Sequence, residues 1–134
     1  MKFVFHILPA IPTNSPEERE RLAPIAHNTE KTQQMLDEML DITQYCEDLG
    51  FDVVTYSEHH FYTEGGEAGA SPTPHLIRLL ENTKRIKIGP LGFALPTWDP
   101  IRLAEDIAWA DQMSKGRTIC GLARGLFPRW VNVL

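Results

Sequence analysis

Two adjacent histidines preceded by a glutamate are the first residues of this sequence that could carry chemistry. Glu58, His59 and His60 follow directly after an apolar, β-branched segment at residues 51–56. A histidine at the end of a strand can act as a general base, because its unperturbed pKa lies near neutral pH. We therefore treat His59 as a candidate base, and Glu58 as a group that orients His59 or neutralises a basic partner.

Other interpretations of these three residues stay open at this point. The histidines could be held by backbone partners at a strand end, and Glu58 could be a solvated loop acid. A metal site is the third interpretation. Adjacent residues at a strand end rarely present converging ligands, and no second cluster of His, Cys or Asp is evident in the sequence. We therefore predict no metal site.

Glycines and an arginine elsewhere suit a flat ligand that carries a phosphate. Gly89 and Gly92 lie in an apolar segment that ends at Pro96, and glycine lets a planar ring approach the backbone closely. The alternative is that glycine serves only a bend in the strand. Arg124 follows the apolar segment 118–123. Its guanidinium matches a phosphate in bidentate geometry; an ordinary surface arginine is the alternative.

Alternating strands and helices must position these residues. Apolar segments predict strands at residues 2–8, 51–56, 86–95 and 118–123. Helical spacing of apolar residues predicts helices at 32–49, 73–83 and 100–115. Apolar strands joined by helices predict an α/β fold with a parallel sheet. Residues 9–31 are predicted to form a long loop with a helical turn from Ser15, and loops of this length are more often functional than idle.

Composition and charge exclude several classes of protein. The 134 residues suffice for one core, and the net charge of −5 leaves no basic stripe for nucleic acid. No apolar run approaches the roughly 20 residues that span a bilayer, and residues 1–8 lack the cleavage site of a signal peptide. Cys46 and Cys120 are predicted to be free thiols in the core. We therefore expect a cytoplasmic chain with a small-molecule or protein partner, and no nucleic acid or membrane.

Four ordered blocks of the sequence resemble the bacterial luciferase-like family of flavin-dependent monooxygenases. The match runs from Met1 to about Gly125, and the blocks are Leu49–Asp52, Glu58–Phe61, Asp111–Arg117 and Arg124–Leu126. The last two blocks are most similar to the alpha subunit of the bioluminescent alkanal monooxygenases. The block at residues 58–61 favours this monooxygenase branch over branches of the superfamily that use a deazaflavin.

The resemblance implies a fold and a domain organisation. The family fold is a TIM (β/α)8 barrel, which takes about 250 residues. Residues 1–134 would form the N-terminal half of it, a single half-barrel domain with four parallel strands and three crossover helices, as a fragment or truncated form. Open strand edges and an uncovered apolar face favour association, so a homo-oligomer is expected, and Trp109 could lie in its interface. The tail at residues 127–134 departs from the family, in which a helix should follow.

The resemblance also implies a cofactor and roles for the site residues. Reduced FMN would react with O2 to oxidise a small organic substrate, a long-chain aldehyde by closest resemblance. A separate reductase would supply the flavin, because the sequence has no G-x-G-x-x-G fingerprint. The flavin ring would lie against Leu91 and Gly92, which the family often joins by a non-prolyl cis peptide bond. Arg124 would contact the flavin phosphate, and His59 would transfer protons.

A second function also fits the length of the sequence. The remaining phosphate ligands of the family come from later strands, which lie beyond the matched region. The alternative is therefore a non-catalytic, self-associating, truncated luciferase-like protein with weak or no flavin binding.

Overall fold

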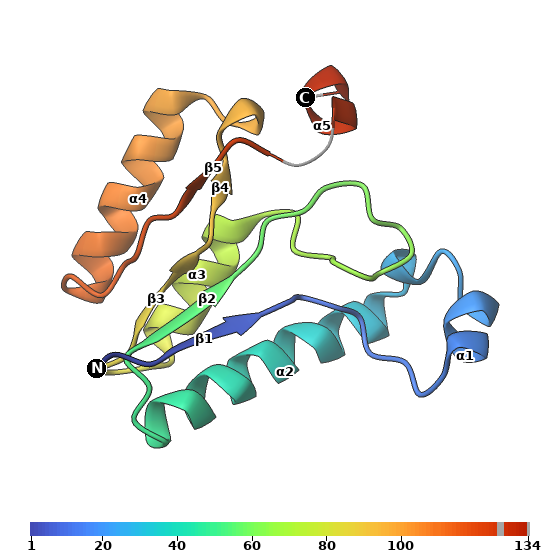
Figure 1. The fold of residues 1–134 in the computed structure, drawn as a ribbon, viewed down its shortest axis with the longest axis horizontal. Coiled ribbons are helices and arrows are strands. Elements are labelled where there is room, and N and C mark those ends of the chain that lie inside the picture. Colours follow the sequence, from blue (N-terminus) through green and yellow to red (C-terminus); the bar gives the residue numbers. More distant parts are fainter. Residues whose placement is uncertain (126–127, 134) are drawn as a thin grey trace.

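A parallel sheet with helices packed on one side forms the main body of the structure, a computed structural model that describes residues 1–125 and 128–133 (Figure 1). Its strands are β1 (Val4–Ile7), β2 (Val53–Tyr56) and β3 (Lys87–Pro90), in the order β1-β2-β3. Both neighbouring pairs are parallel, with Val4 opposite Val53 and Val53 opposite Lys87. The predicted parallel α/β fold is therefore confirmed.

The third and fourth predicted strands are shorter and more interrupted than the sequence indicates. Residues 86–95 divide into β3 and β4 (Phe93–Ala94), and the Leu91–Gly92 peptide bond between them is cis. In the fourth segment only β5 (Leu122–Ala123) is a strand, and it pairs in parallel with β4. Main-chain bonds from Ile119 N to Ile88 O (2.8 Å) and from Gly121 N to Pro90 O (3.1 Å) continue the parallel alignment upstream. Among the described residues, the four predicted strand segments thus contain five short strands.

The three crossover helices lie where the apolar periodicity predicts them. They are α2 (Thr29–Asp48), α3 (Pro72–Glu81) and α4 (Pro100–Ser114). The side chains of Asn28 and Asp99 cap α2 and α4 by accepting hydrogen bonds from backbone N–H groups of the first turn. The predicted helical turn from Ser15 is α1 (Pro16–Arg21), which is followed by the 3-10 helix η1 (Ile25–His27).

The tail corrects one expectation. The sequence of residues 127–134 gives no sign of the helix that follows in the family, yet the chain forms the short helix α5 (Pro128–Val133). Another 3-10 helix, η2 (Leu95–Thr97), follows β4. In Figure 1, α5 lies beyond the end of β5, on the same side of the molecule as the carboxyl ends of the strands.

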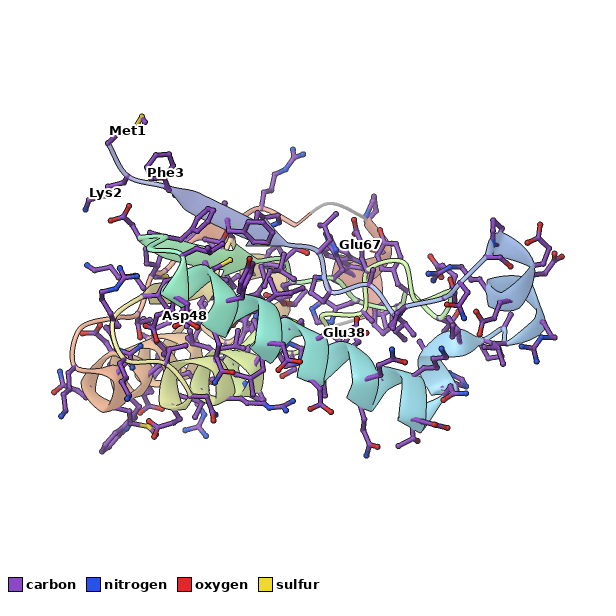
Figure 2. The ribbon with its side chains drawn as sticks, turned by 90° about the horizontal axis from the view of Figure 1, so that it is seen from below. Met1, Lys2, Phe3, Glu38, Asp48 and Glu67 are labelled. Carbon is purple, nitrogen blue, oxygen red and sulfur yellow. The ribbon has the colours of Figure 1, made fainter. Side chains whose placement is uncertain are left out.

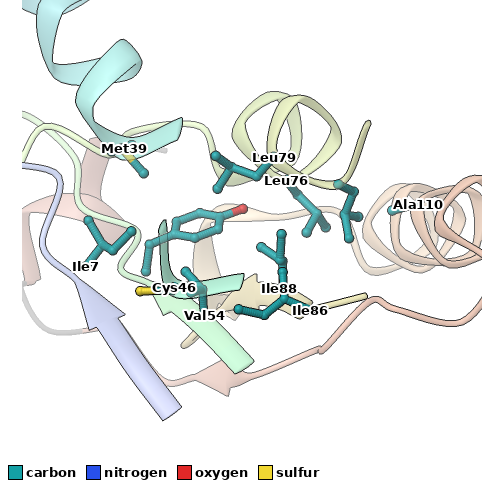
Figure 3. Packing of buried hydrophobic residues seen from close by; sticks show 11 residues of the cluster. Ile7, Met39, Cys46, Val54, Leu76, Leu79, Ile86, Ile88 and Ala110 are labelled. Atoms are coloured by element: carbon teal, nitrogen blue, oxygen red, sulfur yellow. The ribbon is translucent and has the colours of Figure 1, made fainter. Parts of the chain in front are cut away.

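The main core lies between the sheet and helices α2, α3 and α4 (Figure 3). Val54 of β2 and Ile88 of β3 are fully buried there, against Leu76 and Leu79 of α3. Cys46 is buried in this cluster as predicted, but Cys120 is exposed, so the prediction of a core thiol is wrong for Cys120. Cys120 lies beside α4, where it lines an open cavity with Ala104, Ile107 and Ala108 instead of packing into the core.

Apolar side chains remain exposed on the outside of this core. Phe3 and Val4, at the N-terminal end of the chain (Figure 2), are 53% and 57% exposed, and Leu122 of β5 is 61% exposed. Trp109 projects from α4 and is 70% exposed. Among the described helices, none is both long and apolar enough to cross a membrane.

Candidate functional site

One cavity gathers five of the residues that the sequence singles out, whereas His60 and Gly89 do not line it. It has a volume of about 200 Å³ and lies at the carboxyl ends of β2, β4 and β5. Its walls include Glu58 and His59 after β2, Leu91 and Gly92 between β3 and β4, and Arg124 after β5. Parallel strands end at one edge of a sheet, so groups of residues 32 or more positions apart in the chain meet there.

Contacts to both its backbone and its ring hold His59 in place. Its backbone N–H donates a hydrogen bond to the Gly69 carbonyl at 3.1 Å, and its Nδ1 atom faces the carboxylate of Glu67. The rings of Tyr62 and Trp130 lie with their centroids 5.6 Å from the imidazole. Burial lowers the pKa of His59, while the carboxylates of Glu67 and Glu58 act in the opposite direction. A neutral imidazole at pH 7 is the form that a general base needs.

Glu58 pairs with the other histidine. Its oxygen lies 2.7 Å from Nε2 of His60, and its side chain has no exposed surface. The carboxylate also accepts hydrogen bonds from the Ala94 backbone N–H (2.8 Å), the Thr97 hydroxyl (3.0 Å) and the Trp98 indole N–H (3.0 Å). The expectation that Glu58 orients His59 is therefore wrong, because the carboxylate that faces His59 belongs to Glu67.

Gly89 and Gly92 lie where the backbone of the adjacent segment, residues 119–121, comes too close for a side chain. A Cβ on Gly92 would lie 2.5 Å from the carbonyl carbon of Gly121, and one on Gly89 would lie 1.8 Å from the Ile119 oxygen. Both positions therefore require glycine whether or not a ring lies against them. The cis peptide bond between Leu91 and Gly92 is the one that the family resemblance implies at this point.

Arg124 lies at the rim of the cavity and is exposed. Among the described residues, no carboxylate lies within ion-pairing distance of its guanidinium. The guanidinium is therefore available to an anionic group that enters the cavity. By contrast, Arg117 is occupied: it donates to the Leu80 carbonyl (2.7 Å) and the Thr83 hydroxyl (3.0 Å) near the end of α3.

Two residues of this region were missed by reasoning from the sequence. Trp130 of α5 is 2% exposed and contributes to the cavity wall, but its segment carries no clear periodic pattern. Glu67 lies in the loop that follows β2 and is labelled in Figure 2. It is one of three acidic residues in or next to this loop, and no spacing rule indicates which of them returns to His59. In the described part of the chain, no group of three potential ligands is placed to hold a metal ion.

Comparison with known proteins identifies the family. The model of the family described as "Luciferase-like monooxygenase" matches residues 18–130, most of the chain. This chain belongs to the luciferase-like monooxygenase family. An alkanal monooxygenase alpha chain from a Kryptophanaron alfredi symbiont is 38% identical over 72% of this chain and 26% of its own length. A beta chain from Photorhabdus luminescens is 36% identical over 72% of this chain and 29% of its own length.

Solved structures support the luciferase-like fold. The oxygenating constituent of 3,6-diketocamphane monooxygenase from Pseudomonas putida, solved in complex with FMN, has a TM-score of 0.75 and 22% identity. The monooxygenase RslO1 from Streptomyces bottropensis has a TM-score of 0.77 and 23% identity. Each covers 99% of this chain, which covers 32% and 36% of them. The chain thus spans about a quarter of the length of its curated relatives and about a third of these structures.

Proposed function

We propose that this chain holds FMN in the cavity at the strand ends and forms the flavin-binding part of an FMN-dependent monooxygenase. The reaction would oxidise a small organic substrate with reduced flavin and O2, and a long-chain aldehyde is the substrate suggested by the alkanal monooxygenase relatives. The observation that supports this most directly is the single cavity that joins His59, the Leu91–Gly92 backbone and Arg124.

The cavity residues fit a flavin in chemistry, and they account for only part of its surface. The turn at Leu91–Gly92 offers main chain to a flat ring, and the guanidinium of Arg124 offers a charge to a phosphate. At about 200 Å³ the cavity is smaller than the roughly 300–1,000 Å³ of typical ligand pockets. We propose that further strands of a (β/α)8 barrel complete it, since the relatives are three to four times longer than the part matched here.

Each residue has a separate task in this proposal. When bound in its reduced form, the flavin supplies the electrons that activate O2, and a separate reductase delivers it. Arg124 binds the phosphate and so fixes the position of the ring. His59, neutral because burial lowers its pKa, accepts and returns a proton during oxidation of the substrate. Glu58 holds His60, Ala94 and Trp98 together and thereby shapes the wall of the cavity.

We further propose that copies of the chain associate through the outer face of α4. Ile101 and Trp109 are each 70% exposed and Met113 is 49% exposed. Their spacing of eight and four residues places all three on one side of the helix. Exposed apolar stripes of this kind mark interaction surfaces.

The free thiols of Cys46 and Cys120 are in keeping with the reducing conditions of a cytoplasmic location.

Flavin binding and turnover by the complete gene product test the proposed function. FMN is added to the purified protein while flavin fluorescence is followed, and a long-chain aldehyde is then supplied with chemically reduced FMN and O2. We expect saturable binding and formation of the carboxylic acid. If neither oxidised nor reduced FMN binds, the proposed function is wrong.

A non-catalytic, self-associating protein is the second candidate. The observation that favours it is exposed apolar surface, because Phe3, Val4 and Leu122 are each more than half exposed. This function predicts assemblies in sedimentation that neither bind flavin nor retain its absorbance. Flavin bound by the assembled protein would decide for the monooxygenase.

A further inference from the structure

The loop after β2, residues 57–71, folds back so that Gly69 contacts His59 near its start. Gly69 accepts the hydrogen bond from the His59 backbone, and a Cβ on Gly69 would lie 2.6 Å from the Ser57 oxygen. The two ends of the loop are therefore in contact, and only glycine fits at the point of closure. Glu67, two residues before Gly69, is thereby placed with its carboxylate against Nδ1 of His59.

The segment between β1 and α2 holds this loop in place. The Ile11 N–H donates to the Gly65 carbonyl (2.9 Å), and the Ala26 N–H donates to the Thr63 carbonyl (3.1 Å). The guanidinium of Arg19 donates to the carbonyls of Glu64 and Ile11, both at 2.8 Å. The loop that carries Glu67 is thus fixed by a second segment rather than standing free in solvent.

His59 lies between two cavities, and its ring nitrogens differ in their neighbours. Glu67 lines a second cavity, of about 230 Å³, whose wall includes Ile11, Phe61 and Ala68. His59 lines both this cavity and the first one, whereas Glu67 lines only the second. Because Nδ1 faces Glu67, Nε2 is the ring nitrogen left for a group in the first cavity.

We propose that Glu67 is the positioning residue of His59: its carboxylate accepts the Nδ1 proton, fixes the neutral tautomer and leaves Nε2 as the proton acceptor. A carboxylate that binds one ring nitrogen sets which nitrogen carries the proton. The role of Nε2 in catalysis rests on the proposed function, but the tautomer and its cause belong to the protein alone. They are therefore measurable without flavin.

Four ionisable groups influence His59, and only one is altered in the experiment. The carboxylates of Glu67 and Glu58 favour its protonated form, whereas His60 and His6 disfavour it. Replacing Glu67 by glutamine removes one favourable charge and leaves the other three groups in place. The pKa of His59 should then fall further below its usual value.

The test combines NMR of the histidine ring nitrogens with steady-state kinetics. In the flavin-free parent above the pKa of His59, we expect the proton on Nδ1. In Glu67→Ala the Nε2–H form should become the major one, and in Glu67→Gln the pKa should fall. Glu64→Ala and Glu64→Gln are matched controls, because Glu64 is exposed on the same loop and its backbone carbonyl, not its carboxylate, makes the contact with Arg19. Both controls should leave tautomer and pKa unchanged.

Kinetics distinguish failure of this inference from failure of the proposed function. If FMN-dependent oxidation occurs, Glu67→Ala should lower kcat by about 10–100-fold, the range seen when a carboxylate that orients a metal-bound histidine is removed. An Nε2–H tautomer in the parent, or an unchanged tautomer in Glu67→Ala, would overturn the inference whatever the kinetics. The expected NMR result in a protein without FMN-dependent turnover would support the positioning role and count against the monooxygenase.

Discussion

The two adjacent histidines differ more than their position in the sequence indicates. Each lies beside a carboxylate, but the side chain of Glu58 is fully buried with four donors around it, whereas that of Glu67 is 30% exposed. Hydrogen bonds of Glu58 connect the end of β2 with β4 and η2, and His60 is one of its hydrogen-bond partners. Glu67 contacts His59 from a loop. The first pair is therefore part of the scaffold, whereas the second lies where a loop meets two cavities.

Removal of the buried carboxylate should have the largest effect. Glu58→Gln places an amide group among donors and disrupts the network, which should lower the free energy of unfolding by about 3–5 kcal/mol. Chemical denaturation monitored by circular dichroism measures this loss. Glu67→Gln, the matched change at the other pair, should cost less than about 1 kcal/mol. Equal losses in the two variants would contradict the distinction between a scaffold pair and a site pair.

Substitution of the histidines should separate activity from stability. His59→Ala should reduce FMN-dependent oxidation of an aldehyde by about 10²–10⁴-fold, because a general base contributes that much to a rate. Flavin affinity should change little, since the proposed site assigns the phosphate to a different residue, Arg124. His60→Ala should lower stability and reduce turnover less. Rates of product formation in single turnover check this. An unaffected rate in His59→Ala would show that His59 is not the general base.

Arg124 offers a smaller effect that depends on the ligand. Arg124→Ala should weaken binding of FMN by about 10–100-fold, because a hydrogen bond to a charged group contributes about 1.5–3 kcal/mol. Riboflavin lacks the phosphate, so its affinity should stay within about twofold of the parent value. Fluorescence titrations with both ligands make the comparison, and equal losses would show that the guanidinium does not contact the phosphate.

Acid should destabilise the protein modestly through two half-buried histidines, His59 and His75. Burial lowers the pKa of both His59 and His75 in the folded state, so the unfolded chain binds more protons as the pH falls below about 6.5. Stability should therefore fall with decreasing pH in that range, by at most about 1.4 kcal/mol per pH unit for each group. Unfolding at several pH values should show a shallower slope in His75→Gln and in His59→Gln. Slopes identical to that of the parent would contradict the lowered pKa values.

The order of elements could be predicted from local patterns, whereas His59, Leu91, Gly92 and Arg124 were assigned to one site by the family resemblance. Apolar periodicity locates α2, α3 and α4, and parallel strands bring their carboxyl ends together. The same alternation could have identified the partner of Glu58. In an extended segment, residues two apart point to one side, so treating residues 58–60 as extended would have predicted the pairing of Glu58 with His60.

Other features depend on contacts that no local pattern records. β3 and β4 are separated at Leu91–Gly92, where the backbone of Gly121, from the adjacent segment of the same chain, approaches closely. The place of Glu67 depends on closure of its loop at Gly69 and on support from the segment before α2. The exposure of Cys120 depends on how closely α4 packs against its segment, where a cavity remains, and an apolar run does not indicate this.

The location of bound FMN tests the central claim most directly. A crystal structure of the complete gene product with FMN should show the flavin ring against Leu91 and Gly92, the phosphate at Arg124, and the His59 ring facing the same cavity with Nδ1 on Glu67. FMN bound elsewhere, with these residues away from it, would contradict the assignment of this cavity as the flavin site.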